Sequence, residues 1–121
     1  MSQGKCNWFF PDGEMPEADN GPLKAHESII VLNPGEAQAR VSMTLYFEEE
    51  PPKRGIQFTV EPERVRCIRM DDPRQLQGYV VEVGKQYAIK LESDVPVIAQ
   101  YGRLDTSQAN MAFYTTQGYA E

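Results

Sequence analysis

The chain has 121 residues, a length typical of one domain that can bury a core without disulfides. It carries 12 Lys and Arg against 18 Asp and Glu, and the net charge of −6 argues against a dedicated nucleic-acid binder, which usually has a basic domain. No stretch approaches the roughly 18 apolar residues of a membrane span, so direct membrane insertion is not expected. The first ten residues lack the apolar segment of a secretory signal, and a cytoplasmic location is therefore predicted.

The first half of the chain alternates apolar and polar residues, as short β-strands with one buried face do. An aromatic strand is predicted at Cys6–Phe10, followed by a long loop rich in Pro, Gly, Asp and Asn. Ser28–Leu32 is an apolar run of the fully buried kind, and Arg40–Phe47 has the pattern of a half-buried strand. Because the turn Asn33–Glu36 has Pro and Gly at its centre, these two strands are expected to form a hairpin.

The second half continues the pattern of strands joined by turns. Further strands are predicted at Ile56–Val60, Arg64–Met70, Tyr79–Val83, Tyr87–Glu92, Val95–Asp105 and Ala112–Thr116. Glu92–Asp94 separates the last two long strands closely enough to make them a second hairpin, and Ser107–Phe113 can hold a helical turn at most. We therefore expect residues 1–121 to form a single-domain, all-β antiparallel sandwich of about eight strands with little or no helix. A small closed barrel is the alternative.

The residue inventory offers no basis for a metal centre or a catalytic device. His26 is the only histidine, and no ligand-like spacing links it to Cys6 or Cys67, so no metal and no cofactor are expected. The two cysteines are expected to be buried free thiols, as in a reducing compartment, with a disulfide as the alternative. Carboxylates at Glu48–Glu50 and Asp71–Asp72 lie beside prolines and indicate solvated loop charge more than an acid–base pair. No catalytic residue is assigned, and the protein is predicted not to be an enzyme.

The segment Val95–Asp105 is the most informative part of the chain. It begins as an apolar run typical of a buried strand and ends in the polar residues Gln100, Arg103 and Asp105. Arg103 and Asp105 are two residues apart and share one side of the strand, whereas Gln100 lies on the opposite side. Two interpretations stay open: a buried ion pair that fixes a strand end or a subunit contact, or the edge of a site for a ligand or partner.

Trp8, His26 and Glu27 are further candidates for a ligand or partner site. Trp8 could offer a stacking platform to a sugar or base, although core packing or an oligomer interface explains it as well. His26 and Glu27 are strand neighbours that face opposite sides, so they cannot hold one ligand together without a bulge. The simpler interpretation of His26 is a hydrogen bond to backbone, and the functional one is a contact at the rim of the sheet.

Arg64, Arg66 and Arg69 crowd a single predicted strand, the first two on one face and Arg69 on the other. The simpler interpretation is a solvated face that pairs with the many acidic residues. The alternative is a patch that binds an anion or a phosphate group.

Six segments together resemble the sensory rhodopsin transducer family, a group of small soluble bacterial proteins. They are, in order, CNWFFPDGEMP, NGP (Asn20–Pro22), HESIIVLNPG, VSMTLYFEEEPP, TVEPERVRCIRMDD and VPVIAQYGRLDTSQANMAFYTTQGYA. In the last segment the family pattern is an apolar strand, a Gln, two variable residues, Arg-Leu-Asp and a later Gln. That pattern falls here on Gln100, Arg103, Leu104, Asp105 and Gln108. The resemblance covers nearly the whole chain.

The resemblance implies a β-sandwich that assembles as a homotetramer, with no cofactor and no known enzymatic activity. It also implies a membrane photoreceptor as one kind of partner, a sugar or other small molecule as a ligand of some members, and DNA as a ligand of others. The favoured function is a non-enzymatic, signal-transducer-like or small-ligand-binding protein. A DNA-binding transcriptional regulator is the alternative, disfavoured because four copies of an acidic chain repel DNA. A carbohydrate-processing enzyme comes last, since it needs a cleft with two carboxylates.

Overall fold

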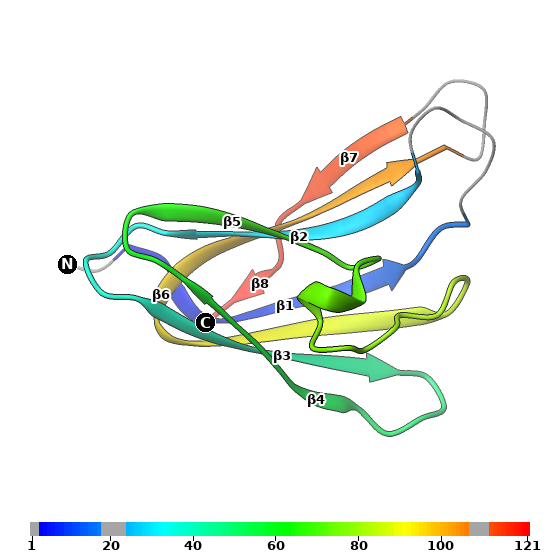
Figure 1. Cartoon of the computed structure of the whole chain (residues 1–121), viewed down its shortest axis with the longest axis horizontal. Helices are drawn as coiled ribbons and strands as arrows, with labels where there is room; N and C mark the ends of the chain where they lie inside the picture. The colour runs from blue at the N-terminus through cyan, green and yellow to red at the C-terminus, as the bar shows by residue number, and fades with distance from the viewer. Residues whose placement is uncertain (1–2, 18–23, 107–111) are drawn as a thin grey trace.

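The computed structural model describes residues 3–17, 24–106 and 112–121, and within them it contains eight strands and one short 3-10 helix (Figure 1). The elements are β1 (Lys5–Glu14), β2 (His26–Asn33), β3 (Ala39–Phe47), β4 (Lys53–Val60), β5 (Arg64–Arg69), η1 (Pro73–Gln75), β6 (Gln86–Asp105), β7 (Ala112–Thr116) and β8 (Tyr119–Ala120). The predicted all-β class is confirmed. No helix in the described parts of the chain is long and apolar enough to cross a membrane.

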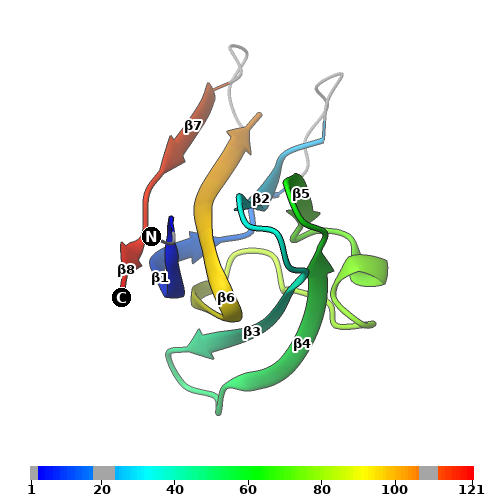
Figure 2. The ribbon, with the colours of Figure 1, turned by 90° about the vertical axis from the view of Figure 1, so that its left-hand side faces the viewer.

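The 20-residue strand β6 belongs to both layers of the sandwich. Its first half lies between β3 and β1, where Leu91 is opposite both Met43 and Trp8. Its second half lies between β2 and β7, where Arg103 is opposite both Glu27 and Tyr114. Figure 2 shows β6 rising from the β3 layer to the layer of β2 and β7. A strand that passes from one sheet to the other turns the corner of a sandwich without a loop.

Three local predictions are wrong. Glu92–Asp94 forms no turn, because these residues lie inside β6. The turn Asn33–Glu36 does not close a hairpin, since β2 pairs with β5 and β6 whereas β3 pairs with β4 and β6. Tyr79–Val83 is not a strand and contributes only a single bridge between Val83 and Met15. Asn20–Pro22, Gln108 and most of the expected helical turn at Ser107–Phe113 lie outside the described residues.

The buried amide of Asn33 explains why the chain changes layers after β2. Its Nδ2 donates to the carbonyl oxygens of Ala37 at 2.8 Å and Val60 at 3.0 Å, and its Oδ1 accepts from the Gly35 N–H at 3.0 Å. These bonds tie the turn to the end of β4 in the other layer. A buried amide with its hydrogen bonds satisfied stabilises one chain path over alternatives.

The core lies between the two layers and follows the predicted alternation. Val41, Met43 and Leu45 are buried on β3, as the sequence predicts. Trp8 is also buried, stacked near Phe10 with ring centroids 6.4 Å apart, and its indole N–H donates to the carbonyl oxygens of Lys5 and Val97. This placement favours core packing over a stacking platform for Trp8.

The expectation of two buried thiols is wrong. Cys6 is half-buried, and Cys67 is exposed. Cys67 lies on β5, which among the described strands pairs with β2 alone and exposes most of its residues to solvent.

Candidate functional site

A fully buried carboxylate, that of Glu27, lies at the start of β2, just before its apolar run. Its Oε1 accepts from the hydroxyl of Tyr87 at 2.7 Å, and its Oε2 accepts from the hydroxyl of Tyr101 and from the Glu14 N–H at 2.9 Å. The donors come from two points of β6 and from β1. A buried charge is tolerated when its hydrogen bonds are made, so this cluster joins three strands of the sandwich.

Burial and the neighbouring Glu27 carboxylate raise the pKa of Tyr87 and of Tyr101. Both phenols therefore stay protonated at physiological pH and remain hydrogen-bond donors to Glu27. Such an arrangement suits a structural anchor and does not suit a group that gives up a proton near pH 7.

The structure brings together only two of the predicted site residues. Glu27 and Arg103 are cross-strand partners of β2 and β6, and Arg103 lies within electrostatic reach of Glu27, Tyr101 and Tyr114. Its Nε is buried and has no hydrogen-bond partner among the described residues. A charged neighbour on the facing strand lowers the cost of burying Glu27.

The other residues predicted at the strand end are apart from this cluster. Gln100 is exposed on the outer face of β6, opposite Ile30. Asp105 ends β6, where it pairs with Ala112 in the ladder. The ring of His26 makes a 2.8 Å hydrogen bond through Nδ1 with the carbonyl oxygen of Lys24, which matches the simpler interpretation of a histidine bonded to backbone.

Sequence reasoning missed Tyr87 and Tyr101. Tyr87 stands at an apolar position of a predicted strand, and Tyr101 lies within the polar end of the predicted strand Val95–Asp105. A buried tyrosine needs a partner for its hydroxyl, and a buried carboxylate needs donors. A carboxylate and tyrosine hydroxyls that are all buried can satisfy each other's hydrogen bonds, and this is the signal that could have linked the two tyrosines to Glu27.

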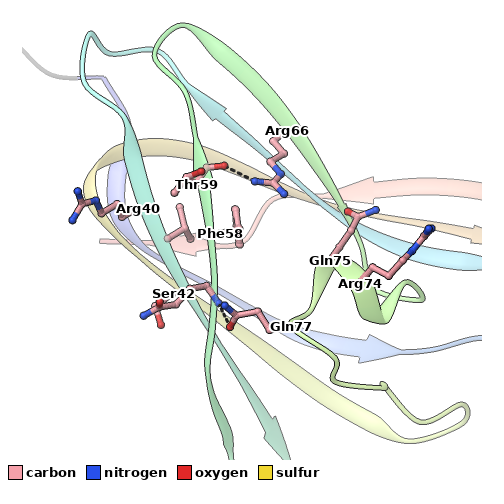
Figure 3. Close-up of a pocket in the computed structure, with 10 residues that line it drawn as sticks. Arg40, Ser42, Phe58, Thr59, Arg66, Arg74, Gln75 and Gln77 are labelled. Carbon is pink, nitrogen blue, oxygen red and sulfur yellow. Dashed lines mark hydrogen bonds between the residues drawn. The ribbon is translucent and has the colours of Figure 1, made fainter.

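A second site is a pocket of about 510 Å³ that surrounds the free edge of β4 (Figure 3). This volume lies within the range of small-molecule pockets. It is lined by Arg40, Val41, Ser42, Gln57, Phe58, Thr59, Arg66, Arg74, Gln75 and Gln77. These residues come from β3, β4, β5, η1 and the residues just after η1, so the sequence separates them although the fold collects them.

Side chains satisfy the free edge of β4 where a further strand would pair. The Nη1 of Arg66 donates to the Thr59 carbonyl oxygen at 2.8 Å, and the guanidinium lies over the Phe58 ring, 5.8 Å from its centroid. The Gln57 N–H donates to Oε1 of Gln77 at 3.0 Å. These bonds occupy backbone groups of the β4 edge that a further strand would otherwise use.

The structure separates the three arginines predicted as an anion patch. Only Arg66 lines the pocket. Arg64 donates to the carbonyl oxygens of Pro62 and Glu63, and Arg69 forms two bonds with Asp71, at 2.8 and 2.9 Å. Although burial opposes it, the bonds of Arg69 and Lys24 lower the pKa of Asp71.

Two other arginines join Arg66 in the pocket, Arg40 from β3 and Arg74 from η1. Arg74 is paired with Asp72 at 3.0 Å, and this hydrogen bond lowers the pKa of the Asp72 carboxyl to about 2. In the part of the chain that the structure describes, Arg40 and Arg66 form no ion pair. No group of three metal-ligating side chains occurs in that part either.

Comparison with known proteins finds a matching family and similar solved structures. A family model described as Anabaena sensory rhodopsin transducer matches residues 3–120. The crystal structure of Thermotoga maritima 1070 is 33% identical, with a TM-score of 0.88 over 99% of this chain and 97% of that one. The Anabaena sensory rhodopsin transducer is 28% identical, with a TM-score of 0.73 over 84% of this chain and 96% of that one. No functionally curated protein matches the chain.

Proposed function

The chain belongs to the Anabaena sensory rhodopsin transducer family, and we propose that it is a cytoplasmic, non-enzymatic, signal-transducer-like protein that binds a small ligand as a homotetramer. The pocket around the free edge of β4 is the observation that carries this proposal. The ligand class is a sugar or a related polar molecule, because amide, hydroxyl and guanidinium groups line the pocket.

The pocket supports binding over carbohydrate hydrolysis. A glycosidase needs two carboxyl groups on either side of the scissile bond. Among the described residues that line the pocket there is no carboxylate. The carboxylate of Glu27 is fully buried and already accepts three hydrogen bonds, so it is committed to the fold.

An apolar stripe on the outer face of the β5–β2–β6 layer supports assembly. Leu32 is opposite Val65 on one side and Ile98 on the other, so the three side chains form a continuous row across three strands. They are 39%, 64% and 40% exposed, respectively. A contiguous apolar patch on a sheet face marks an interaction surface, and a second copy of the chain is the occupant that the proposed homotetramer requires.

Thermal unfolding with a panel of neutral sugars, sugar phosphates and nucleotides tests the ligand, and light scattering tests the assembly. A ligand that binds the folded state raises the melting temperature in a concentration-dependent way. A tetramer mass and stabilisation by at least one compound are expected. No stabilisation by any compound would contradict the ligand-binding function, and a monomer mass would contradict the assembly.

A membrane photoreceptor is the second candidate partner. The observation that favours it is the fold shared with a protein named Anabaena sensory rhodopsin transducer over 96% of that chain. A rhodopsin gene beside the gene for this chain, followed by co-purification of the two products, would support it. DNA binding is the remaining alternative, and the absence of a mobility shift even at low salt would exclude it.

A further inference from the structure

The pocket concentrates positive charge in an acidic protein. The whole chain has a net charge of −6, yet three of the ten pocket residues are arginines and none is acidic. Asp72 pairs with Arg74, and the Asp94 carboxylate accepts from the backbone N–H of Arg40 at 2.8 Å. Among the described residues, Arg66 is the pocket arginine that has no acidic partner. A local excess of one sign in a hollow attracts ligands of the opposite sign.

Arg66 is positioned in advance for an anion. Its contact with the Thr59 carbonyl oxygen and the Phe58 ring fixes the plane of the guanidinium at the edge of β4. One of its five N–H donors is used in that hydrogen bond, and the others remain for a ligand. A planar, fixed guanidinium fits two oxygens of a phosphate group at once.

Neutral hydrogen-bond donors line the same pocket as the Arg66 guanidinium. The bond from the Gln57 N–H occupies Oε1 of Gln77 and leaves the amide nitrogen of Gln77 available to donate. Ser42 lines the same pocket. Figure 3 shows Arg66 and Arg74 on the β5 and η1 side, with Ser42 and Arg40 on the side of β3. Amides and hydroxyls are the groups that recognise the hydroxyls of a polyol.

We propose that the pocket binds a small sugar phosphate, with the phosphate group at Arg66 and the sugar hydroxyls toward Gln77 and Ser42. This inference rests on the proposed small-ligand function and gives its ligand a chemical class. Arg40, whose guanidinium points away from Arg66 in Figure 3, supplies further positive charge at the opposite rim.

The test compares glucose 6-phosphate, glucose and inorganic phosphate by thermal unfolding, at equal concentration and ionic strength in a phosphate-free buffer. Glucose 6-phosphate is expected to stabilise the protein more than either other compound. Arg66→Gln is expected to weaken its binding about tenfold, the effect of losing one charge-assisted hydrogen bond. Arg64→Gln is the matched control, because Arg64 lies two residues away on β5 and does not line the pocket; it should change the affinity less than twofold.

The outcomes separate this inference from the general function. Stabilisation by glucose alone would overturn the inference and leave the ligand-binding function standing, whereas no stabilisation by any compound of the wider panel would remove both. Equal stabilisation by inorganic phosphate would overturn the sugar part of the assignment. Equal effects of the two substitutions would overturn the site. If Arg66→Gln does not fold, Arg66→Lys tests the same contact, because it keeps the charge but cannot hold two phosphate oxygens at once. It should weaken the binding of glucose 6-phosphate more than Arg64→Gln does, and equal affinities of the two variants would overturn the site.

Discussion

The substitution Glu27→Gln tests whether the buried carboxylate anchors the sandwich. The amide keeps the size of the side chain but removes its charge, and its NH₂ group faces donors where an acceptor oxygen stood. Hydrogen bonds to a charged group contribute about 1.5–3 kcal/mol each, and three are affected. We expect the substitution to lower the free energy of unfolding by about 3–4 kcal/mol, since relaxation recovers part of the loss.

Thermal unfolding at a fixed protein concentration measures this loss. The unfolding entropy of a chain of this length makes 1 kcal/mol worth roughly 4 °C, so a fall of roughly 12–16 °C is expected. Glu92→Gln is the matched control, because Glu92 lies on β6 with an exposed side chain and a single 3.4 Å ion pair to Lys90; its effect should stay below about 0.5 kcal/mol. Equal melting temperatures of the two variants would refute the anchoring role of Glu27.

Three further predictions concern the same framework. Because the pKa of Tyr101 is raised in the folded state, the stabilising effect of its protonated hydroxyl is complete below the unfolded pKa of about 10 and is lost as the pH rises above it. Tyr101→Phe should therefore flatten the loss of unfolding free energy between about pH 10 and 11, measured by urea unfolding, whereas the exposed control Tyr119→Phe should not. The same dependence of unfolding free energy on pH in both variants would count against the Glu27–tyrosine hydrogen bonds. Leu32→Glu should reduce the mass measured by light scattering, and Val83→Glu, another exposed apolar position, should not; an unchanged mass for Leu32→Glu would remove the stripe as an interface. Asn33→Ala should lower the free energy of unfolding by about 2–3 kcal/mol, because it leaves buried carbonyl groups without donors; a loss below about 0.5 kcal/mol would show that the turn does not depend on this amide.

The predicted hairpin at Glu92–Asp94 failed for a physical reason. Three polar residues between apolar runs look like a turn, but polar residues also occur where a strand leaves one sheet for another. Ser93 pairs with Val41, and the Asp94 carboxylate accepts from the Arg40 N–H at 2.8 Å, so both are held by strand β3. Only that contact with a distant strand distinguishes a corner of the sandwich from a turn.

The cluster of Glu27, Tyr87 and Tyr101 could be predicted only in part from local sequence patterns. Alternation along β2 predicts that Glu27 and His26 point to opposite sides, and the structure agrees, with Glu27 buried and His26 bonded to the backbone near the surface. The tyrosines that complete the cluster are 60 and 74 residues away. No spacing rule connects such residues, because the register between β2 and β6 is set by the packing of two layers.

The sequence by itself determined the all-β class, most of the strands and which side chains face the core, because these follow from alternation and turn residues within a few positions. It also pointed to Arg64, Arg66 and Arg69 together as a candidate anion patch. Only the tertiary structure decided that Arg40 and Arg74 join Arg66 while Arg64 and Arg69 do not. The pocket forms at the edge of β4 that has no neighbouring strand among those described. Which strand lies at the edge of a sheet depends on the arrangement of all the strands, and no local pattern in the sequence specifies it.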